Sequence, residues 1–287
     1  MNTKKYLSRI LIASLLVTSM LSCEKELEDH TPPSVSEFST FTLSGSYYIR
    51  DIATTEYKIP VGITTVSDQP RTVELTITSP TGAVNGTHYT APTSITIPAG
   101  AADDTLVFKG IFDAYNGGRI DTLNIKITGG DVPPNAYGTS YNLVLRQYCD
   151  VVLSDFVGDY TNTRETNSSG GSPYGPYTST ISNPIQTSAT TGTIVLGNFW
   201  DYPGVEVLAK LDWSDPANFK VTIDRQPLGI NYAAGQPMDV RTAAGQPNSF
   251  SSCSQEFNLS LDFLVNNYPG PGQTASYSSN YKIYIKR

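Results

Sequence analysis

The sequence predicts an all-β protein that consists of two consecutive antiparallel domains. Apolar residues recur at every second position in many short segments, which is the spacing of a strand with one buried face. The segments between them are rich in turn formers, and the chain holds 23 glycines and 19 prolines. Beyond the N-terminal segment, no stretch carries the three-to-four-residue spacing of an amphipathic helix.

The first domain is predicted to span residues 37–149 as an immunoglobulin-like sandwich. In "YKIPVGI" the side chains of Tyr57, Ile59, Val61 and Ile63 fall on one face. The segments "VELTITS" and "DTLNIKIT" alternate in the same way, and "FTLSGSYYI", "TSITI", "TLVFKGI" and "YNLVL" complete the set. About seven strands over roughly 110 residues are typical of such a sandwich.

The second domain is predicted to span residues 150–287. Its clearest strands are "GTIVLGNF", "VEVLAKLDW", "NFKVTIDR", "EFNLSLDF" and "YKIYIKR". One side of the second of these is apolar and consists of Val205, Val207, Ala209, Leu211 and Trp213. Loops such as "NNYPGPGQT" hold residues that favour turns. About eight strands joined by hairpins favour an up-and-down barrel, with a second sandwich as the alternative.

The N-terminal segment has the layout of a secretory signal. Lys4, Lys5 and Arg9 form a basic start without an acidic residue, and residues 10–21 are almost purely apolar. That apolar run is shorter than the roughly 20 residues that a membrane-spanning helix needs. We predict a signal peptide over residues 1–22.

Cys23 follows the small residue Ser22 directly, which resembles the lipidation site of bacterial lipoproteins. The resemblance implies that acyl chains on Cys23 hold the mature chain in the outer membrane, since two or more chains anchor a protein stably. An ordinary secreted protein is the alternative. Residues 23–36 are expected to hold the lipidated cysteine and a flexible tether. Their acidic run "EKELEDH" resembles the surface-export signals of lipoproteins from the phylum Bacteroidota, and a merely solvated tether is the alternative.

The charge balance is acidic, with a formal net charge of −7. Removing the leader takes away basic residues only, so the mature chain is more acidic still. Nucleic-acid binding needs a basic face that displaces counterions, and we therefore expect no nucleic-acid partner. No glycine-rich phosphate loop stands between a strand and a helix, and we expect no cofactor.

Residues suited to catalysis or metal binding are scarce. The two histidines are His30, in the tether, and His88, in "NGTHYTAP". A serine–histidine–acid triad or a multi-histidine metal site therefore lacks its usual groups. His88 is expected to be a structural loop residue, and we predict no catalytic and no metal-binding residue.

Paired carboxylates remain as a route to a glycosidase-like activity, which needs two Asp or Glu side chains at a fixed separation. Asp201 with Glu206 and Asp212 with Asp215 are close in the sequence. Acidic residues are common in solvated loops, and that is the interpretation we favour.

Five aromatic residues in turn-rich stretches of the second domain are candidates for ligand contact. Aromatic rings offer flat apolar area and lose little side-chain entropy on binding, which suits a sugar face or a peptide. The alternative is that each ring packs against its own turn. The candidates are Tyr174 and Tyr177 in "SPYGPY", Trp200 and Tyr202 in "NFWDYPG", and Tyr268 in "NNYPGPG".

Apart from Cys23, the chain has two cysteines, Cys149 and Cys253. An even pair in an exported protein favours a disulfide, and two free buried thiols are the alternative. Each cysteine shares its parity with the apolar side of a neighbouring strand, so both thiols are expected to point inward. The two thiols can form a disulfide only if their strands lie side by side, and the sequence does not show whether they do.

The segment "NGTHYTAPTSITIPAGAADDTLVFKG" resembles the Calx-β-like modules of Bacteroidota lipoproteins. The resemblance covers residues 38–148 and implies the sandwich fold. His88 stands where calcium-binding members usually carry Asp, and a neutral imidazole is a poor ligand for Ca²⁺, so calcium is not carried over. Asp103 and Asp104 are candidates for an ion site, with two exposed turn acids as the alternative.

The second domain is similar in pattern to lipocalin-like barrels of the same kind of lipoprotein. That family context implies a surface lipoprotein encoded beside glycan- or nutrient-uptake systems. We therefore expect a lipid-anchored cell-surface accessory or binding protein without catalytic activity, with a glycan or peptide ligand and neighbouring uptake proteins as partners. The alternatives are a surface hydrolase that uses loop carboxylates of the second domain, or a structural, adhesin-like component.

Overall fold

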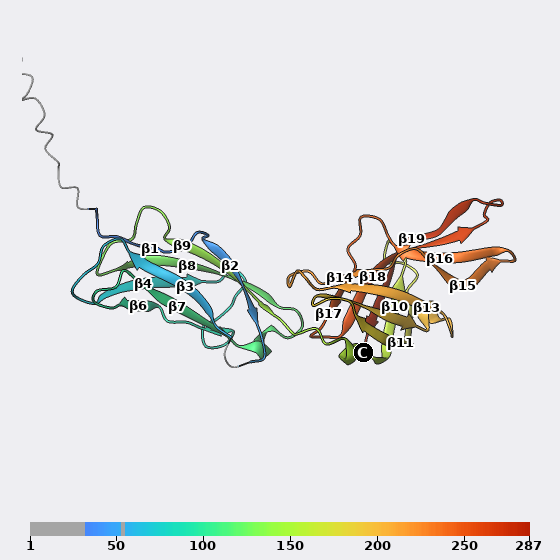
Figure 1. Cartoon of the computed structure of the whole chain (residues 1–287), viewed down its shortest axis with the longest axis horizontal. Helices are drawn as coiled ribbons and strands as arrows, with labels where there is room; N and C mark the ends of the chain where they lie inside the picture. The colour runs from blue at the N-terminus through green and yellow to red at the C-terminus, as the bar shows by residue number, and fades with distance from the viewer. Residues whose placement is uncertain (1–31, 53–54) are drawn as a thin grey trace, which may run out of the picture.

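A computed structural model describes residues 32–52 and 55–287 of the chain. Across this part of the chain the regular structure is β apart from three short 3-10 turns, which confirms the all-β prediction. Within the same residues, no helix is long and apolar enough to cross a membrane. Two domains lie end to end along the long axis of the molecule (Figure 1).

The first domain is a sandwich of two sheets. Its strands are β1 (Ser36–Phe38), β2 (Ser44–Ile49), β3 (Tyr57–Ile63), β4 (Arg71–Thr78), β5 (Tyr89–Thr90), β6 (Ser94–Ile97), β7 (Asp103–Gly110), β8 (Ile120–Gly130) and β9 (Ser140–Gln147), with η1 (Phe112–Tyr115) after β7. One sheet has the order β1-β3-β7-β5 and the other β2-β9-β8-β4-β6. Strands β2 and β9 are parallel, and the other pairs are antiparallel.

The sandwich core consists of the alternating side chains that the sequence predicts. Ile59, Val61 and Ile63 of β3 are buried, and Tyr57 at its start is half-buried. The predicted apolar face of β8 is buried as well. The domain has more strands than the predicted number because β1 and β5 are too short to show an alternation.

The second domain is an eight-stranded antiparallel barrel with an added hairpin. Its elements are η2 (Leu153–Phe156), β10 (Gly158–Thr166), β11 (Tyr174–Gln186), β12 (Thr191–Gly197), η3 (Phe199–Asp201), β13 (Glu206–Asp212), β14 (Lys220–Thr222), β15 (Gln226–Ala233), β16 (Gln236–Thr242), β17 (Ser249–Ser251), β18 (Glu256–Asn266) and β19 (Thr274–Lys286). The chain runs around the barrel in sequence order, and β19 closes it by pairing with both β18 and β10. The β15–β16 hairpin joins through β16, which pairs with the second half of β18.

Apolar side chains fill the barrel. The predicted apolar side of β13 and its flanks is buried throughout, and it comprises Val205, Val207, Ala209, Leu211 and Trp213. Strand β18 contributes Phe257, Leu259, Leu261 and Phe263 to the same core. An eight-stranded barrel has an interior that is narrow enough for side chains to fill.

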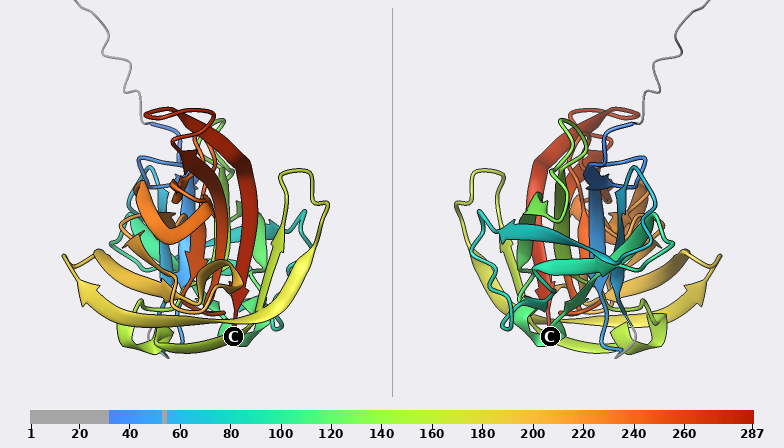
Figure 2. Two further views of the ribbon diagram at one scale, coloured as in Figure 1. Left: turned by 90° about the vertical axis from the view of Figure 1, so that its right-hand side faces the viewer. Right: turned by 90° about the vertical axis from the view of Figure 1, so that its left-hand side faces the viewer.

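The barrel has one end next to the sandwich and one end away from it. The chain leaves the sandwich after β9 and enters the barrel at the start of β10. Because neighbouring strands are antiparallel, β10, β12 and β18 finish at the far end, where β11, β13 and β19 begin. We call this the distal end; it lies to the right in Figure 1 and faces the viewer in the left view of Figure 2.

Candidate functional site

The five predicted aromatic candidates all lie at the distal end of the barrel. Tyr174 and Tyr177 are in the first residues of β11, which extends into the stretch that we expected to be a loop. Trp200 lies in η3, between β12 and β13, and Tyr202 follows it. Tyr268 lies in the turn between β18 and β19. The strand order therefore brings residues from three separate stretches of sequence together.

Aromatic rings form a continuous strip at this end, which we call the aromatic rim. It consists of Trp200, Tyr202, Tyr232, Tyr268 and Tyr277. The Trp200 ring centroid lies 5.8 Å from that of Tyr202 and 5.7 Å from that of Tyr277. Tyr232 continues the strip, at 5.6 Å from Tyr277 and 6.1 Å from Tyr268. Tyr232 and Tyr277 belong to strands β15 and β19 and were not among the candidates predicted from the sequence.

The rim presents its tyrosines to solvent. Tyr202, Tyr232, Tyr268 and Tyr277 are 48%, 53%, 44% and 50% exposed. Large apolar groups that gather on an exposed surface are typical of a binding site rather than of ordinary surface. Tyrosine also carries a hydroxyl at its edge, so one ring offers both stacking area and a hydrogen bond.

Trp200 joins the rim to the core of the barrel. Its ring stacks on that of Phe263 with centroids 4.4 Å apart, and it meets the ring of Tyr281 edge to face with centroids 6.3 Å apart. Trp200 and Asp201 have φ angles of 59° and 54°, which is the left-handed region. That region costs an L-residue roughly 1–2 kcal/mol, and such strain gathers at ligand-binding loops.

A buried carboxylate lies beneath the rim. Glu165 of β10 points into the barrel, is 2% exposed, and accepts hydrogen bonds from the hydroxyls of Tyr177 and Tyr281. Burial raises the pKa of Glu165, and the charge of nearby Asp201 adds to this effect. The hydrogen bonds from the two tyrosines oppose the shift without cancelling it, so the pKa stays above its usual value.

Two of the five candidates differ from expectation. Tyr177 is 9% exposed, so its ring is closed to a ligand; its hydroxyl supports Glu165 instead. Trp200 is half-buried, and its ring contacts both the rim and the core. Tyr174 is exposed, and its hydroxyl donates a hydrogen bond to the Asp201 carboxylate beside the rim.

The carboxylates considered in the sequence make local contacts or are exposed to solvent. Asp212 accepts a hydrogen bond from the Ser214 amide at 2.9 Å, and Asp215 accepts one from the Ala217 amide at 2.9 Å. Both acids therefore shape a turn, as solvated loop acids commonly do. Glu206 is exposed on β13, whereas Asp201 faces Tyr174.

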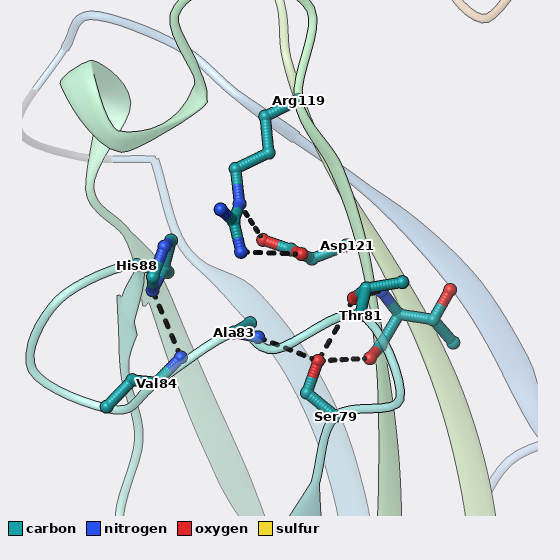
Figure 3. A network of polar contacts seen from close by, with 8 residues as sticks. Ser79, Thr81, Ala83, Val84, His88, Arg119 and Asp121 are labelled. Atoms are coloured by element: carbon teal, nitrogen blue, oxygen red, sulfur yellow. Dashed lines mark hydrogen bonds and ion pairs between the residues drawn. The ribbon is translucent and has the colours of Figure 1, made fainter.

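His88 has a structural place in the sandwich, as expected. Its Nδ1 accepts a hydrogen bond from the Val84 amide at 3.0 Å, within the loop between β4 and β5 (Figure 3). Next to it, Arg119 binds the buried carboxylate of Asp121 through two hydrogen bonds. Burial favours a higher pKa for Asp121, but these hydrogen bonds outweigh it and hold the pKa below its usual value.

The acids considered for an ion site lie at the start of β7. Asp103 and Asp104 are exposed, and Asp104 accepts a hydrogen bond from the Thr105 amide at 2.6 Å. Among the residues that the structure describes, no three His, Cys, Asp or Glu side chains gather as metal ligands do.

A disulfide joins Cys149 and Cys253, with their Cα atoms 5.2 Å apart. Cys149 follows β9, and Cys253 lies in the turn between β17 and β18. The expectation of two inward thiols was wrong, because Cys253 is exposed. Turn residues do not continue the alternation of the strand that follows them, so parity does not apply there.

The signal peptide over residues 1–22, Cys23, His30 and most of the tether lie outside the described residues. Their predicted roles remain predictions.

Comparison with known proteins adds no assignment. No family model matches the chain, and no curated protein matches it. Among solved structures, an apo Calx CBD1 domain is 14% identical and covers 40% of this chain and 98% of its own, with a TM-score of 0.32. A Bacteroides ovatus protein of unknown function is 14% identical, covers 88% and 89%, and has a TM-score of 0.33. A proposed carbohydrate-binding protein from Bacteroides ovatus is 9% identical, covers 88% and 75%, and has a TM-score of 0.33. At these TM-scores, the similarities assign neither a family nor a function to this chain.

Proposed function

We propose that this protein is a lipid-anchored cell-surface binding protein without catalytic activity, and that the aromatic rim contacts a carbohydrate. Acyl chains on Cys23 hold it in the outer membrane, where it works beside uptake proteins in glycan or nutrient acquisition. The observation that supports the ligand assignment is the strip of five aromatic residues at the distal end, four of them about half exposed.

A carbohydrate suits the rim because a sugar ring has apolar C–H faces and hydroxyl edges. The faces stack on the rings, and the edges meet the tyrosine hydroxyls and the Asp201 carboxylate next to Trp200. Neighbouring centroids are 5.6–6.1 Å apart, so the strip is longer than one sugar unit and suits an oligosaccharide. The ligand binds outside the barrel, because apolar side chains fill the interior.

The position of the rim suits a surface receptor. The first described residues lie on the side of the sandwich away from the barrel, and the rim is on the end of the barrel that the sandwich does not cover (Figure 1). A ligand approaching from outside the cell therefore reaches the rim without meeting the membrane.

The test uses the mature chain with Cys23→Ser, which is applied to a glycan array and then titrated with a glycan that binds. Tyr232→Ala and Tyr277→Ala should each weaken binding about tenfold, equivalent to about 1.4 kcal/mol. Tyr137→Ala is the matched control, because Tyr137 is 82% exposed and lies on the sandwich. Release of reducing ends from the bound glycan would instead support the hydrolase alternative. Failure of every glycan to bind, or equal binding by the rim variants, contradicts the proposal.

A further inference from the structure

A concave site lies at the junction of the two domains, at the opposite end of the barrel from the rim. It is a groove of about 720 Å³, within the range of roughly 300–1,000 Å³ that is typical of small-molecule sites. The sandwich lines it with residues 116–120 and 146–149, and the barrel lines it with the loop around Ala217 and with residues 250–254. It shares no residue with the rim.

Arg146 is the unusual residue of this groove. It lies at the end of β9, with its guanidinium 5.7 Å from the ring centroid of Tyr48. One terminal nitrogen reaches across the junction to the carbonyl oxygen of Ala217 at 3.5 Å. The Nε–H group is buried and finds no acceptor among the described residues. A buried donor of a charged group without a partner is energetically unfavourable.

The charges around the groove leave Arg146 as the cation without an ion pair. Arg119 is bound to Asp121 at 2.7 Å, and the other cation of the lining, Lys286, is 3.3 Å from Glu256. Arg146 takes part in none of the ion pairs found among the described residues. The carboxylate of Asp215, whose charge interacts with that of Arg146, accepts hydrogen bonds from its own turn.

Aromatic side chains form the apolar wall of the same groove. Tyr148 and Phe219 come from the two domains and meet edge to face, with centroids 6.0 Å apart. A ligand in the groove therefore meets a cation and an aromatic surface together, within a chain whose formal net charge is −7.

We infer that this groove binds a small organic carboxylate, with Arg146 as its ion-pair partner and the aromatic wall beside its ring. The planar guanidinium carries terminal N–H groups that match a carboxylate in a two-point contact. A uronic acid is the simplest ligand that combines a sugar-sized ring with this charge.

The test titrates the mature chain with D-glucuronate, with D-glucose as the uncharged match, and with inorganic phosphate as an oxyanion without a ring. Glucuronate should bind at millimolar concentration or below, and glucose should not. Arg146→Met should weaken glucuronate binding at least tenfold. Arg146→Lys should have an intermediate effect, because it keeps the charge and loses the planar fork. Arg164→Met is the control for net charge, since Arg164 is exposed and outside the groove.

Amide NMR shifts in the unaltered protein provide a readout that needs no variant. Glucuronate should move the signals of residues 146–149 and 250–254 and leave those of residues 200–202 unchanged. Shifts at the rim alone, binding of glucose as tight as that of glucuronate, or binding of phosphate alone would overturn the inference. So would glucuronate binding that Arg146→Met leaves intact.

Discussion

Replacing Trp200 by alanine removes the ring that links the exposed rim to the barrel core. On one side the ring stacks on Phe263 with centroids 4.4 Å apart, and on the other it meets the rim at Tyr202 and Tyr277. The substitution therefore tests whether the rim is held by the core or is a loose surface feature.

The expected cost follows from the burial of the ring. Truncating a fully buried Trp or Phe to Ala costs about 3–5 kcal/mol, and the half-buried Trp200 belongs at the lower end, near 3 kcal/mol. For a domain of this size, each kcal/mol lost from the free energy of unfolding lowers the melting temperature by about 3 °C. Trp200→Ala should therefore lower the melting temperature by roughly 10 °C. Tyr202→Ala removes an exposed ring from the same loop and should cost less than about 1 kcal/mol.

Urea unfolding followed by tryptophan fluorescence measures both changes. The chain has two tryptophans, and the second, Trp213, is buried in the same barrel core and still reports unfolding when Trp200 is gone. A Trp200→Ala variant within 1 kcal/mol of the unaltered protein would refute the packing argument. So would a Tyr202→Ala variant that loses as much stability as Trp200→Ala.

The backbone at Trp200 gives a second test at the same position. Glycine ordinarily makes a protein less stable than alanine does, but here φ is 59°. Trp200→Gly should therefore be more stable than Trp200→Ala by about 1 kcal/mol, since glycine adopts this conformation without steric cost. The opposite order would show that the left-handed conformation does not persist.

Three further predictions concern other parts of the chain. The pKa of Glu165 is raised in the folded state. The stability that this residue contributes is therefore fully present below its unfolded pKa and is lost as the pH rises through its folded pKa. Urea unfolding at several pH values should show this loss in the unaltered protein and not in Glu165→Gln. The double variant Cys149→Ser, Cys253→Ser opens a loop with a sequence separation of 104 and should lower the free energy of unfolding by up to about 4.7 kcal/mol. Cys23→Ser should release the protein from the membrane fraction, because each buried methylene of an acyl chain contributes about 0.8 kcal/mol.

Each of these has a clear contrary outcome. An equal pH dependence in Glu165→Gln and the unaltered protein would exclude a raised pKa at that residue. Thiol labelling of two cysteines in the denatured, unreduced protein would contradict the disulfide. Quantitative retention of Cys23→Ser with outer membrane in a detergent partition would show that the lipoprotein interpretation is wrong.

Alternation predicted the strands well where the strand is regular. The apolar side of β13 was identified residue by residue, because a regular strand turns every second side chain to the same face. Strand β10 shows the limit. Its pairing with β11 shifts between Tyr160 and Thr163, and the shift moves Glu165 to the inner face. In an unbroken strand, Glu165 would lie on the opposite face from the buried Tyr160 and would point to solvent. Alternation therefore gives no sign of the buried carboxylate.

The aromatic rim was predicted only in part. The sequence pointed to Tyr202 and Tyr268 because they lie in turn-rich stretches, and it gave no reason to select Tyr232 or Tyr277. These two belong to strands, and their exposure depends on hairpins that extend past the closed part of the barrel.

Local patterns were enough to predict the all-β class and most of the core, because the direction of a side chain on a strand depends only on its neighbours in sequence. The sites depended on barrel closure and domain docking. Glu165 accepts a hydrogen bond from Tyr281, which is 116 residues away, and Arg146 reaches Ala217, which is 71 residues away. The energy of such contacts depends on distance in space, and sheet register and closure set that distance without leaving a local trace in the sequence.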